Sequence, residues 1–190
     1  MKNQDILKIK ENKTSIEIAS FFKKRFSPRV FSQNEIKNND LEIIFEAVRW
    51  TPSSYNRQPW FFYLAKRGKA GFERLSALLF DGNSWAKKAP VLILGCFIEN
   101  DDYGKNIYAQ YDLGQAVATL VYQAQILGYY SHQMAGFDKD KAKTIVEKNH
   151  TPWVMIALGK LGDYEKAPEK LVALDFKKSQ RKEKIYDVII

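Results

Sequence analysis

Two uninterrupted apolar segments constrain the fold of this chain more than any other feature. Pro90–Ile98 reads PVLILGCFI, and Trp153–Gly159 reads WVMIALG. A strand that is apolar at every position, rather than at alternate positions, is typical of a strand covered on both faces. Both segments are far shorter than the ~20 apolar residues that a membrane helix needs. We therefore predict a buried central sheet with helices on its two faces.

Helical periodicity and end signals predict the elements around these strands. The clearest helix is Asp112–Leu127, whose apolar residues recur every three or four positions and whose end is marked by Gly128. Helices alternate with strands along the chain, which favours an α/β or α+β protein. Residues 1–14 are polar and lysine-rich, so we expect a flexible lead-in followed by one domain over residues 15–190. Further helices are predicted at 15–24, 39–50, 70–80 and 139–147, and further strands at 60–65 and 129–134.

The composition excludes several kinds of chemistry. Cys96 is the only cysteine, and His132 and His150 are the only histidines, so the chain makes no internal disulfide and no zinc-finger set, and we expect no metal site. Cys96 lies inside an apolar strand and is expected to be an inert core thiol. His132 is expected to form a local hydrogen bond or to approach a cofactor. Redox chemistry would need a bound cofactor, because these side chains provide little of their own.

The net charge of +8 at pH 7 comes mainly from the two ends of the chain, residues 1–37 and 160–190. A solvated basic surface and an anion-binding site both fit this distribution. No helix-turn-helix, zinc or RNA-recognition signature accompanies the charge, so we do not expect nucleic acid as a partner. The N-terminus has no apolar signal core, and we expect a cytoplasmic protein without a membrane partner.

Two arginines flank a serine in the segment Arg25-Phe-Ser-Pro-Arg29, directly after the first predicted helix. In an extended segment alternate residues point to the same side. Arg25, Ser27 and Arg29 could therefore present two guanidinium groups and a hydroxyl to a phosphate. On these residues alone, a solvated basic helix end is the plainer interpretation and a phosphate site is the alternative.

A polar loop, TPSSYNRQPW over Thr51–Trp60, joins a predicted helix to a predicted strand. Its hydroxyls and amides are hydrogen-bonding groups that suit a flat heteroaromatic ring with carbonyls and ring nitrogens. The composition supports a ligand-binding loop and a structural turn about equally.

Taken together, these two motifs resemble the opening of the nitroreductase family of FMN-dependent flavoproteins. R-x-S-x-R is followed by P-S-S-x-N-x-Q-P-W, in that order. Met134-Ala-Gly-Phe-Asp138 resembles the family's Gly-Phe-Asp turn beside the flavin, and Ser179-Gln-Arg-Lys-Glu-Lys-Ile resembles its C-terminal basic segment. The resemblance covers residues 15–190. It implies an α+β fold with a central, mostly antiparallel sheet flanked by helices, assembled as an intertwined homodimer.

The resemblance also implies which residues bind the flavin. The phosphate and ribityl chain would be held by Arg25, Ser27, Arg29 and Arg181, with Phe26 where several members have a histidine that touches the flavin. The isoalloxazine edge would be lined from the other subunit by Pro52, Ser53, Ser54, Asn56 and, less strongly, Gln58. A pyrimidine carbonyl would meet Asn83, and backbone amides near flavin N5 would come from Met134, Ala135 and Gly136.

The implied activity is a ping-pong reduction, with no catalytic side chain because the chemistry lies on the flavin. NADH or NADPH would pass a hydride to flavin N5, and a small oxidised acceptor, such as a nitro compound or quinone, would then be reduced. Two departures from the family stand out. Ala135 replaces a frequent glutamate, and only a short segment separates Ile98 from Asp112, where larger members insert helices. A non-catalytic flavin-binding or storage protein and a flavoprotein of other chemistry remain alternatives.

Overall fold

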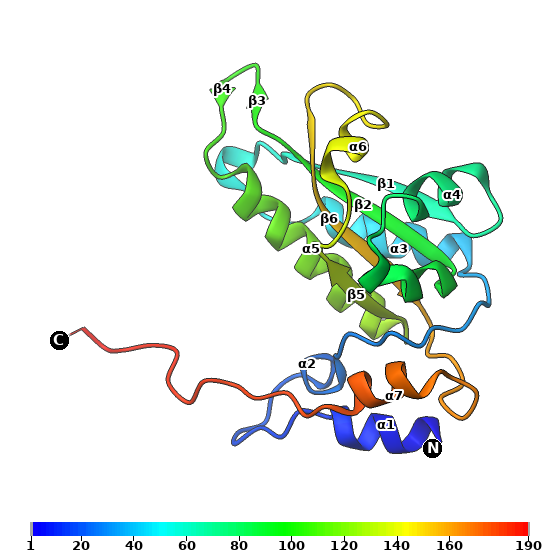
Figure 1. Cartoon of the computed structure of the whole chain (residues 1–190). Helices are drawn as coiled ribbons and strands as arrows, with labels where there is room; N and C mark the ends of the chain where they lie inside the picture. The colour runs from blue at the N-terminus through cyan, green and yellow to red at the C-terminus, as the bar shows by residue number, and fades with distance from the viewer. Residues whose placement is uncertain (1, 190) are drawn as a thin grey trace.

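The two apolar segments form the two inner strands of one antiparallel sheet. The computed structural model describes residues 2–189, and its main sheet has the strand order β1-β2-β6-β5 (Figure 1). Each neighbouring pair of strands is antiparallel. Every residue of the second strand is buried except the last, which confirms a strand covered on both faces. The strands are β1 (Trp60–Lys66), β2 (Val91–Ile98), β5 (Tyr130–Met134) and β6 (His150–Gly159).

Successive side chains of β2 enter two separate cores. Val91 and Ile93 belong to a core that includes helices α3 (Asn38–Arg49) and α5 (Ala109–Ile126). Leu92 and Leu94 belong to another core on the opposite face. Because side chains alternate along a strand, continuous apolar character lets one strand serve both cores, and the predicted helix-covered α+β sheet is confirmed. The second face is covered by α4 (Ala70–Ser76), the 3-10 helix η2 (Asp81–Lys88) and α6 (Lys139–Lys143).

A small hairpin fills the connection between β2 and α5. Its strands, β3 (Asn100–Asp101) and β4 (Gly104–Lys105), pair with each other in antiparallel fashion. The hairpin lies next to the 3-10 helix η1 (Ser54–Asn56), beside the N-terminal end of α5 (Figure 1). The polar loop of the sequence is thus placed at one end of the long helix.

A layer formed by the two ends of the chain packs at the other end of the molecule (Figure 1). It contains α1 (Asn3–Lys10), α2 (Ser20–Lys24) and α7 (Glu169–Phe176). The expectation of a flexible lead-in is wrong for α1, because Ile6 is fully buried in a cluster with Phe26 and Tyr164. Residues 177–189 leave this layer as an exposed segment that extends away from the body (Figure 1).

The predicted elements agree in type with the structure and differ at their ends, whereas α1 and the β3–β4 hairpin lie where no element was predicted. The helix expected from residue 15 begins at Ser20, and those expected to reach residues 80 and 147 end at Ser76 and Lys143. Helix α7 was not predicted. Within residues 2–189, no helix combines the length and apolarity needed to cross a membrane.

Candidate functional site

The R-x-S-x-R segment leaves α2 in an extended conformation, as its pattern predicts. Arg25 has φ −71° and ψ 123°, and its Nη1 lies 3.5 Å from Ser27 Oγ. The two side chains therefore project to the same side, because alternate residues of an extended chain share a face. This places a guanidinium group beside a hydroxyl, both of them partly exposed.

Arg29 is tied to a buried carboxylate on α7. Its backbone N–H donates to Asp175 Oδ2 at 2.7 Å, and its Nη1 donates to Asp175 Oδ1 at 3.0 Å. The hydroxyl of Tyr164 donates to the same carboxylate at 2.8 Å. The Asp175 side chain has no exposed surface, and a buried charge is stable only when paired and hydrogen-bonded. Arg29 thus anchors the segment to the C-terminal helix, with about a quarter of its own side chain exposed.

Phe26 points the opposite way from its basic neighbours. Its ring is buried, and its centre lies 5.2 Å from that of Tyr130. The alternation that exposes residues 25 and 27 turns the side chain of residue 26 into the core, so the Phe26 ring does not share their face. The backbone of Phe26 remains the part that a ligand could reach.

Lys10 is a cation near this segment that the sequence did not single out. Its Nζ donates to the carbonyl oxygen of Lys177 at 2.6 Å. Together with Arg181 it lines a groove of about 440 Å³ between α1, the following loop and the tail. Arg181, predicted as a phosphate ligand, is exposed, and its Nη1 donates to the adjacent Gln180 carbonyl at 2.9 Å. Arg181 and Lys10 therefore share a groove, which Arg25, Ser27 and Arg29 do not line.

His132 and Trp85 connect the basic segment to the next part of the site. His132 Nδ1 lies 2.9 Å from Pro28 O, so Nδ1 carries the proton, since a carbonyl only accepts. The His132 and Trp85 ring centres are 4.5 Å apart, and the guanidinium of Arg29 lies 6.0 Å from the Trp85 ring. Burial lowers the pKa of His132, which favours the neutral imidazole. Of the two roles considered, the local hydrogen bond is the one that the structure describes.

Asn83 lies against the predicted turn at residues 134–136. Its Nδ2 donates to Gly136 O at 2.9 Å, and a Cβ added at Gly136 would lie 2.7 Å from that nitrogen. A side chain at this position would therefore displace the Asn83 amide from the Gly136 carbonyl. Ala135 is exposed, whereas the Met134 side chain is buried in the core, so a ligand could meet only the backbone of Met134. Since Asn83 and Trp85 both belong to η2, the turn adjoins Arg29.

The polar loop is held in an unusual backbone conformation. Tyr55, Asn56 and Gln58 have φ values of 52°, 55° and 47°, a left-handed region that costs non-glycine residues about 1–3 kcal/mol each. The backbone N–H of Ser54 donates to Asp112 Oδ2 at 3.1 Å, and that of Gln58 to Ser53 Oγ at 2.9 Å. The loop is thus shaped by its own serine and by α5, and it presents the exposed residues Pro52, Tyr55, Asn56 and Gln58.

Arg57 fastens the same loop to the β3–β4 hairpin. Its Nε donates to Asp101 Oδ2 at 2.8 Å and its Nη2 to Asp101 Oδ1 at 2.5 Å. Nη2 also donates to Gly104 O at 2.6 Å. A two-pronged arginine–carboxylate pair restrains orientation as well as distance, so the loop and hairpin form one unit.

Within one chain the loop and the basic segment lie at opposite ends of α5 (Figure 1). Asp112, in the first turn, holds the loop, whereas Tyr122 contacts the ring of Phe22 on α2 with centres 4.6 Å apart. Ten helical residues correspond to about 15 Å. The structure therefore brings together the predicted residues at 25–29, 83 and 134–136, but not those at 52–58, and it places Arg181 in the groove beside Lys10.

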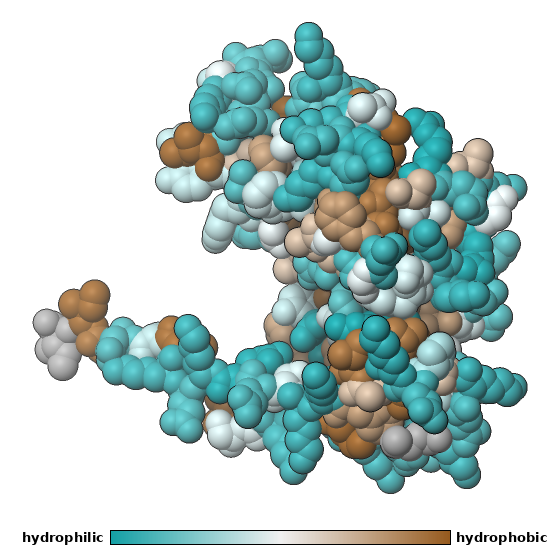
Figure 2. Space-filling view, in the orientation of Figure 1, coloured by the Kyte–Doolittle hydropathy of each residue, from teal (hydrophilic) through white to brown (hydrophobic). Residues whose placement is uncertain are grey.

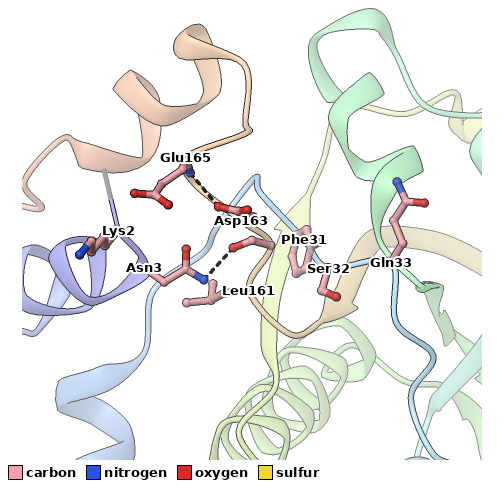
Figure 3. Close-up of a pocket in the computed structure, with 9 residues that line it drawn as sticks. Lys2, Asn3, Phe31, Ser32, Gln33, Leu161, Asp163 and Glu165 are labelled. Carbon is pink, nitrogen blue, oxygen red and sulfur yellow. Dashed lines mark hydrogen bonds between the residues drawn. The ribbon is translucent and has the colours of Figure 1, made fainter.

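A wider hollow of about 520 Å³ lies elsewhere, between α1 and the loop at 161–165 (Figure 3). None of the predicted site residues lines it. Its polar groups hydrogen-bond with one another. Asn3 Nδ2 donates to Gly162 O at 2.8 Å, and the Glu165 N–H donates to Asp163 Oδ1 at 2.9 Å (Figure 3). We therefore place the candidate site at the basic segment and not in this hollow.

Comparison with known proteins points to the family that the sequence motifs resemble. Residues 22–84 match the model of the nitroreductase family. An uncharacterised 15.4 kDa protein of Mycolicibacterium smegmatis is 39% identical over 111 residues, which are 58% of this chain and 76% of that protein. An oxygen-insensitive NADPH nitroreductase of Helicobacter pylori (strain J99) is 30% identical over 118 residues, which are 58% of this chain and 54% of that enzyme. The chain thus spans only about half the length of that relative.

The solved structures place the whole fold in the same group. A structure described as an oxidoreductase containing FMN superposes with a TM-score of 0.82 at 28% identity, covering 90% of this chain and 91% of its own. A nitroreductase family protein from Clostridium difficile 630 has the same fold at a TM-score of 0.67 and 22% identity, with 82% of this chain and 90% of its own covered. The chain belongs to the nitroreductase family.

Proposed function

We propose that this protein is an FMN-dependent oxidoreductase that uses NADH or NADPH to reduce a small oxidised acceptor, such as a nitro compound or a quinone. The observation that carries the proposal is the arrangement of side chains that connects the basic segment at 25–29 to the turn at 134–136. Arg25 and Ser27 stand at one end, and Asn83 with Gly136 stands at the other. Both the family and the structure described as an oxidoreductase containing FMN support this assignment.

The donor set fits a flavin mononucleotide. Guanidinium and hydroxyl groups at Arg25 and Ser27 suit a phosphate dianion. An Asn side chain carries both donor and acceptor atoms, which suit the carbonyl and imide groups of a flavin ring. When bound, FMN would supply the hydride chemistry at N5, taking a hydride from NADH or NADPH and passing it to the acceptor in ping-pong order.

The role of this chain's own residues would be to bind and orient the flavin. Arg25 and Ser27 would bind the phosphate, and Arg29 would add positive charge while its pairing with Asp175 keeps the segment in place. The backbone at Ala135 and Gly136 would present hydrogen-bonding groups to the ring, at a position set by Asn83. Preorganised donors of this kind stabilise negative charge on a reduced cofactor without moving.

We further propose that the working unit is a homodimer, with the loop at 52–58 completing the site of the other subunit. The loop lies too far along α5 to reach the basic segment of its own chain. The outward face of α5 carries Tyr111, which is 67% exposed, and the half-buried Ala118 two turns further on. Large exposed apolar groups mark interaction surfaces.

The extended tail offers further apolar surface for a second copy. It stands away from the body, with apolar side chains near its end (Figure 2). Those side chains belong to Ile185, Val188 and Ile189, each at least 74% exposed. A segment of this kind gains stability when it packs against a partner.

The test is an anaerobic reductive titration of the purified protein. A bound flavin gives a yellow protein, NADH or NADPH should bleach it, and a nitroarene or quinone should restore the colour. A protein that retains FMN but is not bleached by either nucleotide would be the flavin-binding or storage protein of the alternative. A colourless protein that FMN does not reconstitute would refute the proposal.

A further inference from the structure

The last residue of α1 extends the basic group of the R-x-S-x-R segment. Lys10 Nζ lies 5.9 Å from the centre of the buried Phe26 ring, close to the end of α7, whose Asp175 holds Arg29. It also donates to the Lys177 carbonyl, where the tail begins. Lys10 is half-buried, whereas Lys8 on the same helix is exposed. Tertiary contacts therefore hold the Lys10 ammonium where the N-terminal helix, the basic segment and the tail meet.

The charges around Lys10 are unbalanced. Burial lowers the pKa of Lys10, Asp175 raises it, and Arg29, Arg181 and Arg25 lower it further. The Asp175 carboxylate is already engaged by Arg29 and by the hydroxyl of Tyr164. Cations held this close repel one another, and an anion placed among them relieves the repulsion. The arrangement therefore favours a negatively charged ligand.

The groove of about 440 Å³ gives such a ligand access to the ammonium. Lys10 and Arg181 belong both to its wall and to the group of cations described above. Glu11 is the acidic residue of the wall, on the helix end beside Lys10. The remaining side chains are mostly basic or carry hydroxyl and amide groups, namely Asn12, Lys13, Thr14, Lys178 and Ser179, with Ile9 and Ile18.

We propose that Lys10 is a phosphate-binding residue of the flavin site, a cation contributed by α1 beside Arg25, Ser27 and Arg181. The inference rests on the proposed function, since the phosphate is that of FMN. An ammonium group has three hydrogens, of which one is used by the Lys177 carbonyl. The others are available to phosphate oxygens. Lys10 would thereby hold the phosphate and fasten the start of the tail at the same time.

The experiment compares the binding of FMN and of riboflavin, which lacks the phosphate. Lys10→Met keeps the length of the side chain and removes its charge, and Lys8→Met is the matched control on the exposed side of the same helix. We expect Lys10→Met to weaken FMN binding about tenfold, the loss of one charge-assisted hydrogen bond. Riboflavin binding should be unchanged, and Lys8→Met should bind both flavins like the wild type. Lys10→Arg should keep FMN affinity within about threefold, because it keeps the charge.

The outcomes separate this inference from the proposed function. A wild-type protein that binds neither flavin refutes the proposed function itself. A wild-type protein that prefers FMN, with Lys10→Met binding FMN equally tightly, overturns the role of Lys10 alone. Equal weakening of FMN and riboflavin in Lys10→Met also overturns it, because the residue would then act only by anchoring the tail. Thermal unfolding of each flavin-free variant shows whether the change in affinity reflects a loss of folded protein.

Discussion

The guanidinium of Arg29 lies 3.0 Å from a carboxylate of Asp175 that has no exposed surface, although 146 residues separate the two in the chain. This pair joins the segment after α2 to helix α7. Arg29, which is expected to bind phosphate, therefore has a structural role as well. Arg25, whose hydrogen bond is to the nearby Ser27, has no such carboxylate partner among the contacts of the described residues.

The Asp175→Asn variant should therefore have a lower free energy of unfolding than the wild type, although asparagine and aspartate have nearly the same size. The substitution keeps the shape of the side chain but leaves Arg29 without its counter-charge, and breaking a buried ion pair costs about 3–5 kcal/mol. The free energy of unfolding, measured by urea denaturation, gives the comparison. Asp140→Asn is the control, because that carboxylate is 94% exposed and pairs only at the surface. A loss in Asp175→Asn no larger than in the control would contradict the anchoring role.

Arg25→Ala should lose affinity for FMN with little effect on folding. The guanidinium is partly exposed and has only one weak hydrogen bond within the protein, whereas a hydrogen bond to a charged group contributes about 1.5–3 kcal/mol. Fluorescence titration of the flavin-free protein measures the loss. Lys24→Ala removes the adjacent, exposed charge and should bind FMN normally. If both variants bind FMN as the wild type does, the phosphate lies elsewhere.

The half-buried imidazole of His132 should make the fold less stable in acid. Burial lowers its pKa in the folded protein below the ordinary value of 6.5, so the unfolded chain takes up a proton first as the pH falls. The contribution of neutral His132 to the free energy of unfolding is complete above about pH 6.5 and decreases below it. His132→Asn can still donate a hydrogen bond to Pro28 O but cannot titrate. The difference in unfolding free energy between pH 7.5 and pH 5 should be smaller in this variant, and an unchanged difference would rule out His132 as a source.

A charge placed on the outward face of α5 should separate the subunits. Sedimentation of the wild type is expected to give a dimer, and Tyr111→Glu a larger share of monomer with weaker flavin retention, because burying an unpaired carboxylate is costly. Ala77→Glu, an exposed position beside α4, is the control. An FMN-loaded wild-type monomer would contradict the proposal that the loop at 52–58 serves the other subunit.

Much of the site could be predicted because its residues are close in sequence. Arg25 and Ser27 need only an extended backbone to share a face, and Gly136 needs only a turn. The same alternation buries the Phe26 ring against Tyr130, so Phe26 offers its backbone, and not its ring, to that face. Lys10 and Asp175 were not predicted because an isolated lysine or aspartate has no local pattern, and each acquires its partner only when the two ends of the chain meet.

Local pattern alone was enough to indicate a sheet buried on both faces and most of the helices that cover it, whereas its antiparallel pairing was implied by the family resemblance. Continuous apolar strands have to be buried on both faces, and the periodicity of α5 leaves one apolar stripe to cover them. Tertiary structure decided which polar groups became partners. It set Asp175 beneath Arg29 and Lys10 beside the tail, and it placed the loop and the basic segment at opposite ends of α5. These pairings depend on charges that are remote in sequence, and their energies arise only when folding removes water from between them.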